Sequence, residues 1–189
     1  MTEKGRRELA AMVIAPYMAI ATFLISKSRR IGGNQFRHQC ATRAILIDYG
    51  YTDAVLHKAA LVHDIIEDLE GFNQDLIRTA DADGKRVLEL VLEVTRAPGE
   101  TKPDFLTRIR TRGSEKARIL KVADRLSNMH DMGIVSRPDF IERYCDETEN
   151  FIFPMAAGVD QDMLRELRDL VASRRDVLSM MRPVLVCAV

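Results

Sequence analysis

Apolar residues recur every three or four positions along most of the chain, which is the spacing that places them on one face of an α-helix. The 10 glycines and 6 prolines leave long uninterrupted stretches, and this favours helices over a turn-rich β fold. We therefore predict an all-α protein. The predicted helices include Gln35–Tyr49, Ala54–Leu69 and further helices that begin at Asn73, Asp83, Pro103, Ser114, Pro138 and Asp160.

Several predicted helices have clear ends. Gly50 ends the helix Gln35–Tyr49, and Arg96–Pro103 (R-A-P-G-E-T-K-P) is the clearest loop, followed by a helix to about Gly113. The apolar face expected for Gln35–Tyr49 consists of Phe36, Cys40, Ala44 and Ile47. The later helices are expected to run from Asn73 to about Ala80, from Ser114 to about Asp131, from Pro138 to a stop at Pro154 and Gly158, and from Asp160 to about Met181.

The N-terminal region contains a 17-residue run without a charge, Leu9–Ile25, which follows three basic residues and is similar to a signal peptide or a short membrane span. It includes five alanines and Pro16, and it is shorter than the roughly 20 residues that a spanning helix needs. We predict instead two helices that are joined or kinked at Pro16 and buried in the core. The apolar tail, residues 184–189, is expected to dock as a strand or as coil.

Length and composition narrow the class of protein. A chain of 189 residues is expected to form one domain, 1–189, with its motifs in about 20–157 and a C-terminal helix and tail in 158–189. The 28 basic and 28 acidic residues cancel, which disfavours sequence-independent nucleic-acid binding. Three widely spaced cysteines form no disulfide framework, so we expect a cytoplasmic protein. From the charge balance and the short N-terminal run, we expect neither a nucleic-acid nor a membrane partner.

The most informative stretch is L-V-H-D-I-I-E-D, Leu61–Asp68, where four ionisable side chains interrupt an apolar run. On a helix, residues three and four apart are neighbours, so one imidazole and three carboxylates converge. These residues are His63, Asp64, Glu67 and Asp68. Charged groups are rarely buried unless they are paired or bind a metal, so the patch is either a metal site or a half-exposed acidic face with a chance histidine.

Two further stretches carry polar residues at helical spacing. In K-V-A-D-R-L-S-N-M, the side chains of Lys121, Asp124 and Asn128 share one face, as they would in an ordinary helix with an ion pair. In R-R-I-G-G-N-Q-F-R-H, a basic loop with two glycines leads from Arg29 into the helix that carries His38. A histidine alone would more often be a surface residue or a satisfied core residue.

In their order and rough spacing, these motifs resemble those of the HD-domain phosphohydrolases, and most closely the hydrolase domain of the RelA/SpoT family and the small alarmone hydrolases. The matching motifs are R-R-I-G, His38, H-D-I-I-E-D, A-D-R-L-S-N-M and E-T-E-N-F-I-F-P-M-A at Glu147–Ala156. The resemblance implies an HD-domain helical bundle. No synthetase segment follows the hydrolase motifs within these 189 residues.

The resemblance also implies a site and a reaction. It implies metal ligands at His38, His63, Asp64 and Asp124, a donor set that suits a divalent ion such as Mn²⁺. It implies that Glu67 and Asp68 orient the nucleophile and handle its proton. The implied substrate-binding residues are Arg29, Arg30, Lys121 and Asn128. The implied reaction removes the 3′-pyrophosphate of the guanosine alarmones (p)ppGpp, which leaves GDP or GTP and pyrophosphate.

The sequence departs from the family pattern at several positions. The family's R-K is R-R here, Asn34, Gln35 and Arg37 replace hydrophobic and aromatic residues, and His130-Asp131 replaces R-T. We expect these changes to affect the nucleotide side of the pocket more than the metal. One alternative is therefore an HD phosphohydrolase for another nucleotide or an adenosine alarmone. A second alternative is a non-catalytic module that senses a nucleotide or binds a partner.

Overall fold

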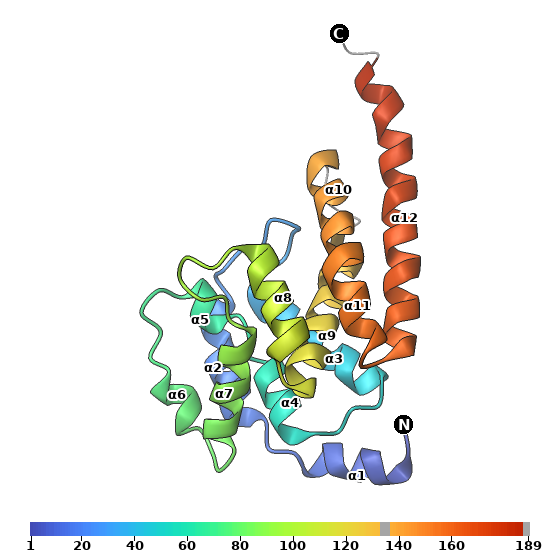
Figure 1. Cartoon of the computed structure of the whole chain (residues 1–189). Helices are drawn as coiled ribbons and strands as arrows, with labels where there is room; N and C mark the ends of the chain where they lie inside the picture. The colour runs from blue at the N-terminus through green and yellow to red at the C-terminus, as the bar shows by residue number, and fades with distance from the viewer. Residues whose placement is uncertain (133–136, 187–189) are drawn as a thin grey trace.

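The computed structural model describes residues 1–132 and 137–186, and every extended regular element in that part of the chain is a helix (Figure 1). The all-α fold predicted from the sequence is confirmed. The elements are α1 (Glu3–Ala11), α2 (Ala15–Ala21), the 3₁₀ helix η1 (Thr22–Leu24), α3 (Gln35–Asp48), α4 (Ala54–Ala60), α5 (Ile65–Asp68), α6 (Asp75–Arg78), α7 (Gly84–Val94), α8 (Lys102–Arg112), α9 (Glu115–Asp131), α10 (Pro138–Glu147), the π-helix η3 (Thr148–Ile152), α11 (Phe153–Ala157) and α12 (Gln161–Val186).

Helix α9 is the central element, because it packs against α3, α7 and α12 and also contacts α4, α8 and α11. Its start is the one predicted, since the Ser114 side chain accepts a hydrogen bond of 3.1 Å from the Ala117 N–H. Its apolar residues, among them Leu120 and Leu126, are fully buried. Polar residues on the same helix therefore reach the interior on a rigid element.

The predicted helix Ala54–Leu69 is broken into α4 and α5, and the expectation of one continuous helix is wrong. The Nδ1 atom of His63 lies 2.9 Å from the Ala60 carbonyl oxygen. In a continuous helix that oxygen would accept from the N–H of residue 64. The Leu61 N–H bonds the carbonyl three residues earlier, that of Lys58, at 3.2 Å, rather than the one four residues earlier as in an α-helix. The chain therefore turns before α5. This turn separates the ionisable residues between two elements.

The buried face of α3 also differs from the predicted one. The structure buries His38, Gln39, Thr42 and Leu46, whereas Ala44 is exposed and the other three predicted residues are only partly buried. His38 and Gln39 turn inward, where Ser127 on α9 and Asp64 in the α4–α5 turn offer them polar partners. Gly50, with a φ of 79°, follows α3 and ends it as expected.

The N-terminal run forms two helices, as predicted, but Pro16 lies in the first turn of α2 rather than at the bend. Helix α2 buries Tyr17 and Ile20, whereas α1 buries only Gly5, so the expected burial is correct for the second helix alone. Within the described residues, no single helix is long and apolar enough to cross a membrane. The one combination that meets those criteria is α1 with α2–η1, and it is bent by 66°.

The C-terminal region differs from the prediction mainly in length. Helical structure continues from α10 through η3 and α11, and Gly158 then caps α11. Helix α12 begins after Asp160 as expected but extends past Met181 to Val186, and it projects well beyond the bundle (Figure 1). The apolar tail, residues 184–189, was expected to dock as a strand or as coil. Residues 184–186 are helical, so this expectation does not hold for them, and residues 187–189 lie outside the described part.

Candidate active site

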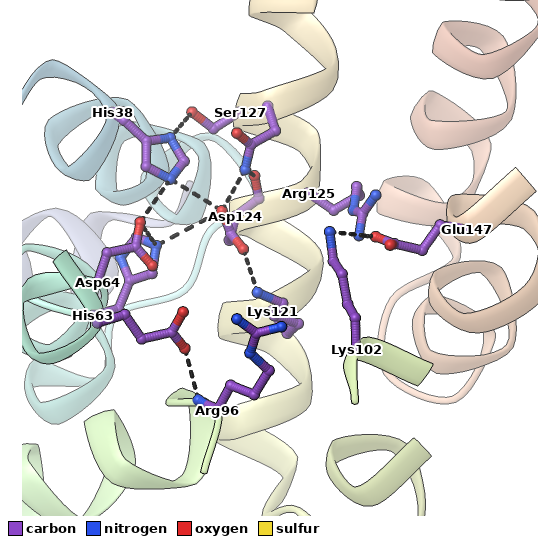
Figure 2. Close-up of polar contacts among 12 residues, drawn as sticks. His38, His63, Asp64, Arg96, Lys102, Lys121, Asp124, Arg125, Ser127 and Glu147 are labelled. Carbon is purple, nitrogen blue, oxygen red and sulfur yellow. Dashed lines mark hydrogen bonds and ion pairs between the residues drawn. The ribbon is translucent and has the colours of Figure 1, made fainter. Parts of the chain in front are cut away.

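The structure brings together the four residues that the resemblance implies as metal ligands (Figure 2). One ligand atom each from His38, His63 and Asp124 lies within 4.8 Å of the others. The Nε2 atoms of His38 and His63 are 3.0 Å and 3.7 Å from Asp124 Oδ1. The Oδ2 atom of Asp64 is 3.5 Å and 3.4 Å from the same two nitrogens. Three separate segments, α3, the α4–α5 turn and α9, thus supply one cluster.

The hydrogen bond of His63 fixes which of its nitrogens can bind a ligand. Because the Ala60 carbonyl only accepts, Nδ1 of His63 must carry the proton, and Nε2 of the neutral ring keeps its lone pair. That Nε2 atom is buried and has no hydrogen-bond partner among the described residues. In His38, Nδ1 lies 2.9 Å from Ser127 Oγ, and Nε2 again faces the carboxylates. Buried nitrogens of this kind, beside carboxylates, fit a divalent cation.

The charges of the cluster favour ionised carboxylates. Burial alone would raise the pKa of Asp124, but the Lys121 ammonium at 2.7 Å and the two histidines hold that pKa well below its usual value. Burial alone would also raise the pKa of Asp64, but its interactions with His63 and His38 hold that pKa below its usual value. Burial opposes protonation of His38, yet its bonds to Asp124 and Asp64 raise its pKa to about 9. A bound cation would therefore displace a proton from His38.

The basic loop before α3 is built by a tight turn. Gly32 and Gly33 adopt φ values of 94° and 71°, which residues with side chains rarely adopt. The Arg29 N–H donates to the Gly33 carbonyl at 3.2 Å, and Asn34 caps α3 through the Arg37 N–H. The turn places two arginines at the mouth of the cluster, but in different surroundings.

Arg29, expected from the family resemblance to bind substrate, pairs with residues of the protein itself. Its side chain is 7% exposed, and its guanidinium donates to Asp131 Oδ2 at 2.5 Å and to Asn128 Oδ1 at 2.7 Å. The Asn128 amide in turn donates to Asp124 Oδ1 at 2.6 Å. Arg29 is therefore tied to the cluster through Asn128, while Arg30 is exposed. The pairing uses Asp131, one of the departures from the family pattern.

Glu67 and Asp68 lie beside the cluster on α5. Glu67 is exposed, and its Oε1 accepts a 2.6 Å hydrogen bond from the Arg96 N–H. Asp68 Oδ2 accepts one of 2.5 Å from Gln35 Nε2. Burial and the charge of Asp64 raise the pKa of Asp68, although the Gln35 bond opposes this. Gln35, another departure from the family pattern, thus contacts a carboxylate of the H-D-x-x-E-D stretch in this structure.

A cavity of about 580 Å³ opens in front of these residues. Of the ten site residues in the sequence-based prediction, nine line it, while His63 does not. Its wall carries seven cations against four carboxylates. Asp131 and Glu147 pair with Arg29 and Arg125 from outside the wall, and an excess of one positive charge remains after they are counted. The cations are Lys27, Arg29, Arg30, Arg96, Lys102, Lys121 and Arg125, and the carboxylates are Asp64, Glu67, Asp68 and Asp124.

Several lining residues were missed from the sequence. They are Lys27, Arg96, Lys102, Phe105, Arg125, Phe140 and Tyr144. The only signal for Arg96 and Lys102 was their place in the loop segment R-A-P-G-E-T-K-P, which follows the acidic motif. The aromatic residues on α8 and α10 gave no signal at all, because only the fold brings those helices to the cavity.

Arg125 lines the cavity and contacts the E-T pair, Glu147 and Thr148, at the junction of α10 and η3. Its guanidinium lies 3.9 Å from the centre of the Tyr144 ring, donates to Thr148 Oγ1 at 3.2 Å and pairs with Glu147. Lys102 joins the same carboxylate at 3.0 Å (Figure 2). The sequence E-T therefore has a structural explanation, since it neutralises a buried arginine next to Asp124.

Comparison with known proteins supports the fold. One matching solved structure is that of a metazoan ortholog of SpoT that hydrolyzes ppGpp and plays a role in starvation responses. The match has a TM-score of 0.73 at 21% sequence identity and covers 85% of this chain and 94% of that chain. This chain has an all-α HD-domain fold. Neither a protein-family model nor a curated protein matches the sequence.

Proposed function

We propose that this protein is a metal-dependent hydrolase of the RelA/SpoT type that removes the 3′-pyrophosphate of (p)ppGpp. The observation that carries the proposal is the buried histidine–carboxylate cluster at the end of a cavity with excess positive charge. Such a cavity suits a substrate with several phosphates. The same fold occurs in a protein that hydrolyzes ppGpp, which supports this choice of substrate.

We propose that His38, His63, Asp64 and Asp124 hold one divalent ion, and that this ion is Mn²⁺. The donor set of imidazoles and carboxylates, without cysteine, supports an ion that accepts both nitrogen and oxygen ligands. When bound, the ion would lower the pKa of a water molecule and polarise a phosphoryl oxygen. The Nδ1 atoms of His63 and His38 contact the Ala60 carbonyl and the Ser127 hydroxyl, and these contacts orient the two imidazoles for metal binding.

The remaining residues divide between binding and proton transfer. Glu67 and Asp68 lie next to the cluster and are placed to orient a nucleophile and accept its proton. Arg30 is exposed at the cavity, where a guanidinium can pair with a phosphate or stack on a base. Lys102 and Tyr144 also line the cavity, which supports binding of a second charged or aromatic part of the nucleotide.

We also propose that the protein acts in the cytoplasm on a small molecule, without a nucleic-acid or membrane partner. The balance of 28 basic and 28 acidic residues supports this, since broad nucleic-acid binding needs a basic excess. The described cysteines, Cys40 and Cys145, are free thiols, as suits a reducing compartment.

A substrate screen tests the proposed function. With Mn²⁺ present, we expect ppGpp to give GDP and pyrophosphate with a kcat/KM well above the values for GTP and dNTPs, which lack 3′ phosphates. Pyrophosphate and phosphate release measured separately across ppGpp, its adenosine counterpart, 3′-phosphorylated mononucleotides, GTP and dNTPs would check this. A preference for GTP or dNTPs would assign the protein to another class of nucleotide hydrolase.

The two loop arginines should respond differently to substitution. Arg30→Ala should mainly raise KM, by roughly 10-fold, because it removes an exposed binding contact and leaves the cluster intact. Arg29→Ala should lower kcat as well, because it frees Asn128 and leaves the Asp131 carboxylate unpaired. Arg165→Ala, an exposed arginine on α12, is the matched control. Steady-state kinetics on ppGpp check this, and identical effects of the two substitutions would contradict it.

A further inference from the structure

Two glutamines on α3 face two aspartates of the stretch Leu61–Asp68, and the spacing of the two pairs matches. Gln35 and Gln39 are one helical turn apart, and so are Asp64 and Asp68. Gln39 Nε2 lies 3.3 Å from Asp64 Oδ2, and Gln35 Nε2 lies 2.5 Å from Asp68 Oδ2. Because an ionised carboxylate only accepts, both amides must turn their NH₂ groups toward the aspartates.

This arrangement leaves both glutamine carbonyl oxygens in an unfavourable position. The Oε1 atoms of Gln35 and Gln39 are buried and have no hydrogen-bond partner in the part of the protein that the structure describes. Buried polar atoms without partners destabilise a fold, and an apolar side chain would fill the same space without that penalty. The glutamines are therefore better explained by what their NH₂ groups do for the aspartates than by packing.

Gln35 belongs to a small frame that fixes Asp68 from two sides. The Gln35 main-chain N–H donates to the Lys27 carbonyl at 2.9 Å, and Lys27 Nζ donates to the Asp68 carbonyl oxygen at 2.8 Å. Lys27 thus fixes the main chain of Asp68, and the Gln35 side chain, which donates to Oδ2, fixes its carboxylate. The other carboxylate oxygen, Oδ1, has no hydrogen bond to a described residue, and Asp68 is one of the residues that line the cavity.

We propose that Gln35 is a positioning residue, which orients the carboxylate of Asp68 toward the reacting group in the cavity. The proposal rests on the proposed function, because it assigns a role within that hydrolytic site. Gln35 acts through Asp68 rather than on the substrate. Its removal should therefore affect turnover more than substrate binding, and the effect should depend on the Asp68 carboxylate.

A double-mutant cycle tests this role. Gln35→Met keeps the length of the side chain and removes the donor, and it should lower kcat by roughly 10- to 100-fold, the range expected for a misplaced catalytic group. KM should change by less than about 3-fold, because binding contacts remain. In an Asp68→Asn background, Gln35→Met should cost less than about 2-fold, because the group it positions is already lost. Gln35→Glu, which places a second carboxylate beside Asp68, should lower kcat at least as much as Gln35→Met.

Controls separate this role from general damage and from failure of the proposed function. Gln161→Met changes an exposed glutamine on α12 that donates to the Ala157 carbonyl at the end of α11, and it should leave kcat unchanged. Metal content and unfolding temperature of Gln35→Met should match the wild type. A fully active Gln35→Met, a loss of metal, or losses that multiply with Asp68→Asn would overturn the role of Gln35 alone. A wild type that hydrolyses another nucleotide in place of (p)ppGpp would refute (p)ppGpp as substrate. The same mutant cycle would then be run with that nucleotide. A wild type that hydrolyses no nucleotide would overturn both.

Discussion

Replacing Asp124 with alanine should remove metal binding, lower kcat by at least about 10³-fold and destabilise the protein. Metal ions in such sites contribute several kcal/mol to the stabilisation of a transition state, and Asp124 lies beside both histidines of the cluster. Its carboxylate accepts from Lys121 and Asn128 and lies 3.0 Å from His38 Nε2. No other single side chain joins the histidines to the buried lysine in the described part of the chain.

The loss of stability has a separate cause. Lys121 is 14% exposed and pairs with Asp124, so alanine would leave a largely buried ammonium without its carboxylate. Breaking a buried pair in this way typically costs about 3–5 kcal/mol. Asp124→Asn keeps the shape and an oxygen for Lys121, so it should lose the metal with a smaller decrease in stability. The two variants therefore separate the metal effect from the charge effect.

Thermal unfolding with Mn²⁺ and with a chelator measures both effects. The wild type should gain about 2.7 kcal/mol when free metal is at 100 times its Kd, and neither Asp124 variant should gain anything comparable. Asp75→Ala, which removes an exposed carboxylate on α6, is the control and should behave as the wild type. If Asp124→Ala kept both its metal content and its activity, the proposed metal site would be wrong.

The parts of the fold that could be predicted depend on local signals. Ser114 starts α9 because a side-chain cap needs only the next three residues, and Gly50 ends α3 because its φ of 79° favours glycine. Such signals can be found in one sequence. The ten site residues expected from the sequence were predicted mainly from the order of motifs, which is also a property of the sequence.

The parts that could not be predicted depend on contacts between distant residues. The break between α4 and α5 requires His63 to take the Ala60 carbonyl, and apolar periodicity does not reveal such competition. Arg29 is buried only because Asp131, 102 residues away, lies opposite its guanidinium. The positive excess of the cavity likewise arises when α8 and the preceding loop fold over the acidic cluster. These features emerge only from the three-dimensional arrangement.

Replacing Glu67 with glutamine should separate catalysis from metal binding. The carboxylate contacts only the Arg96 N–H among described residues, and a glutamine oxygen can accept the same bond, so the local structure should be preserved. The variant loses the ability to take a proton, which should lower kcat by roughly 10²–10⁴-fold. Metal content and unfolding temperature should stay at wild-type values. Glu70→Gln, three residues further along and exposed, gives the matched control. Full activity in Glu67→Gln would contradict this role and leave Asp68 as the remaining candidate for proton transfer. Asp68→Asn should then show the decrease in kcat of roughly 10²–10⁴-fold.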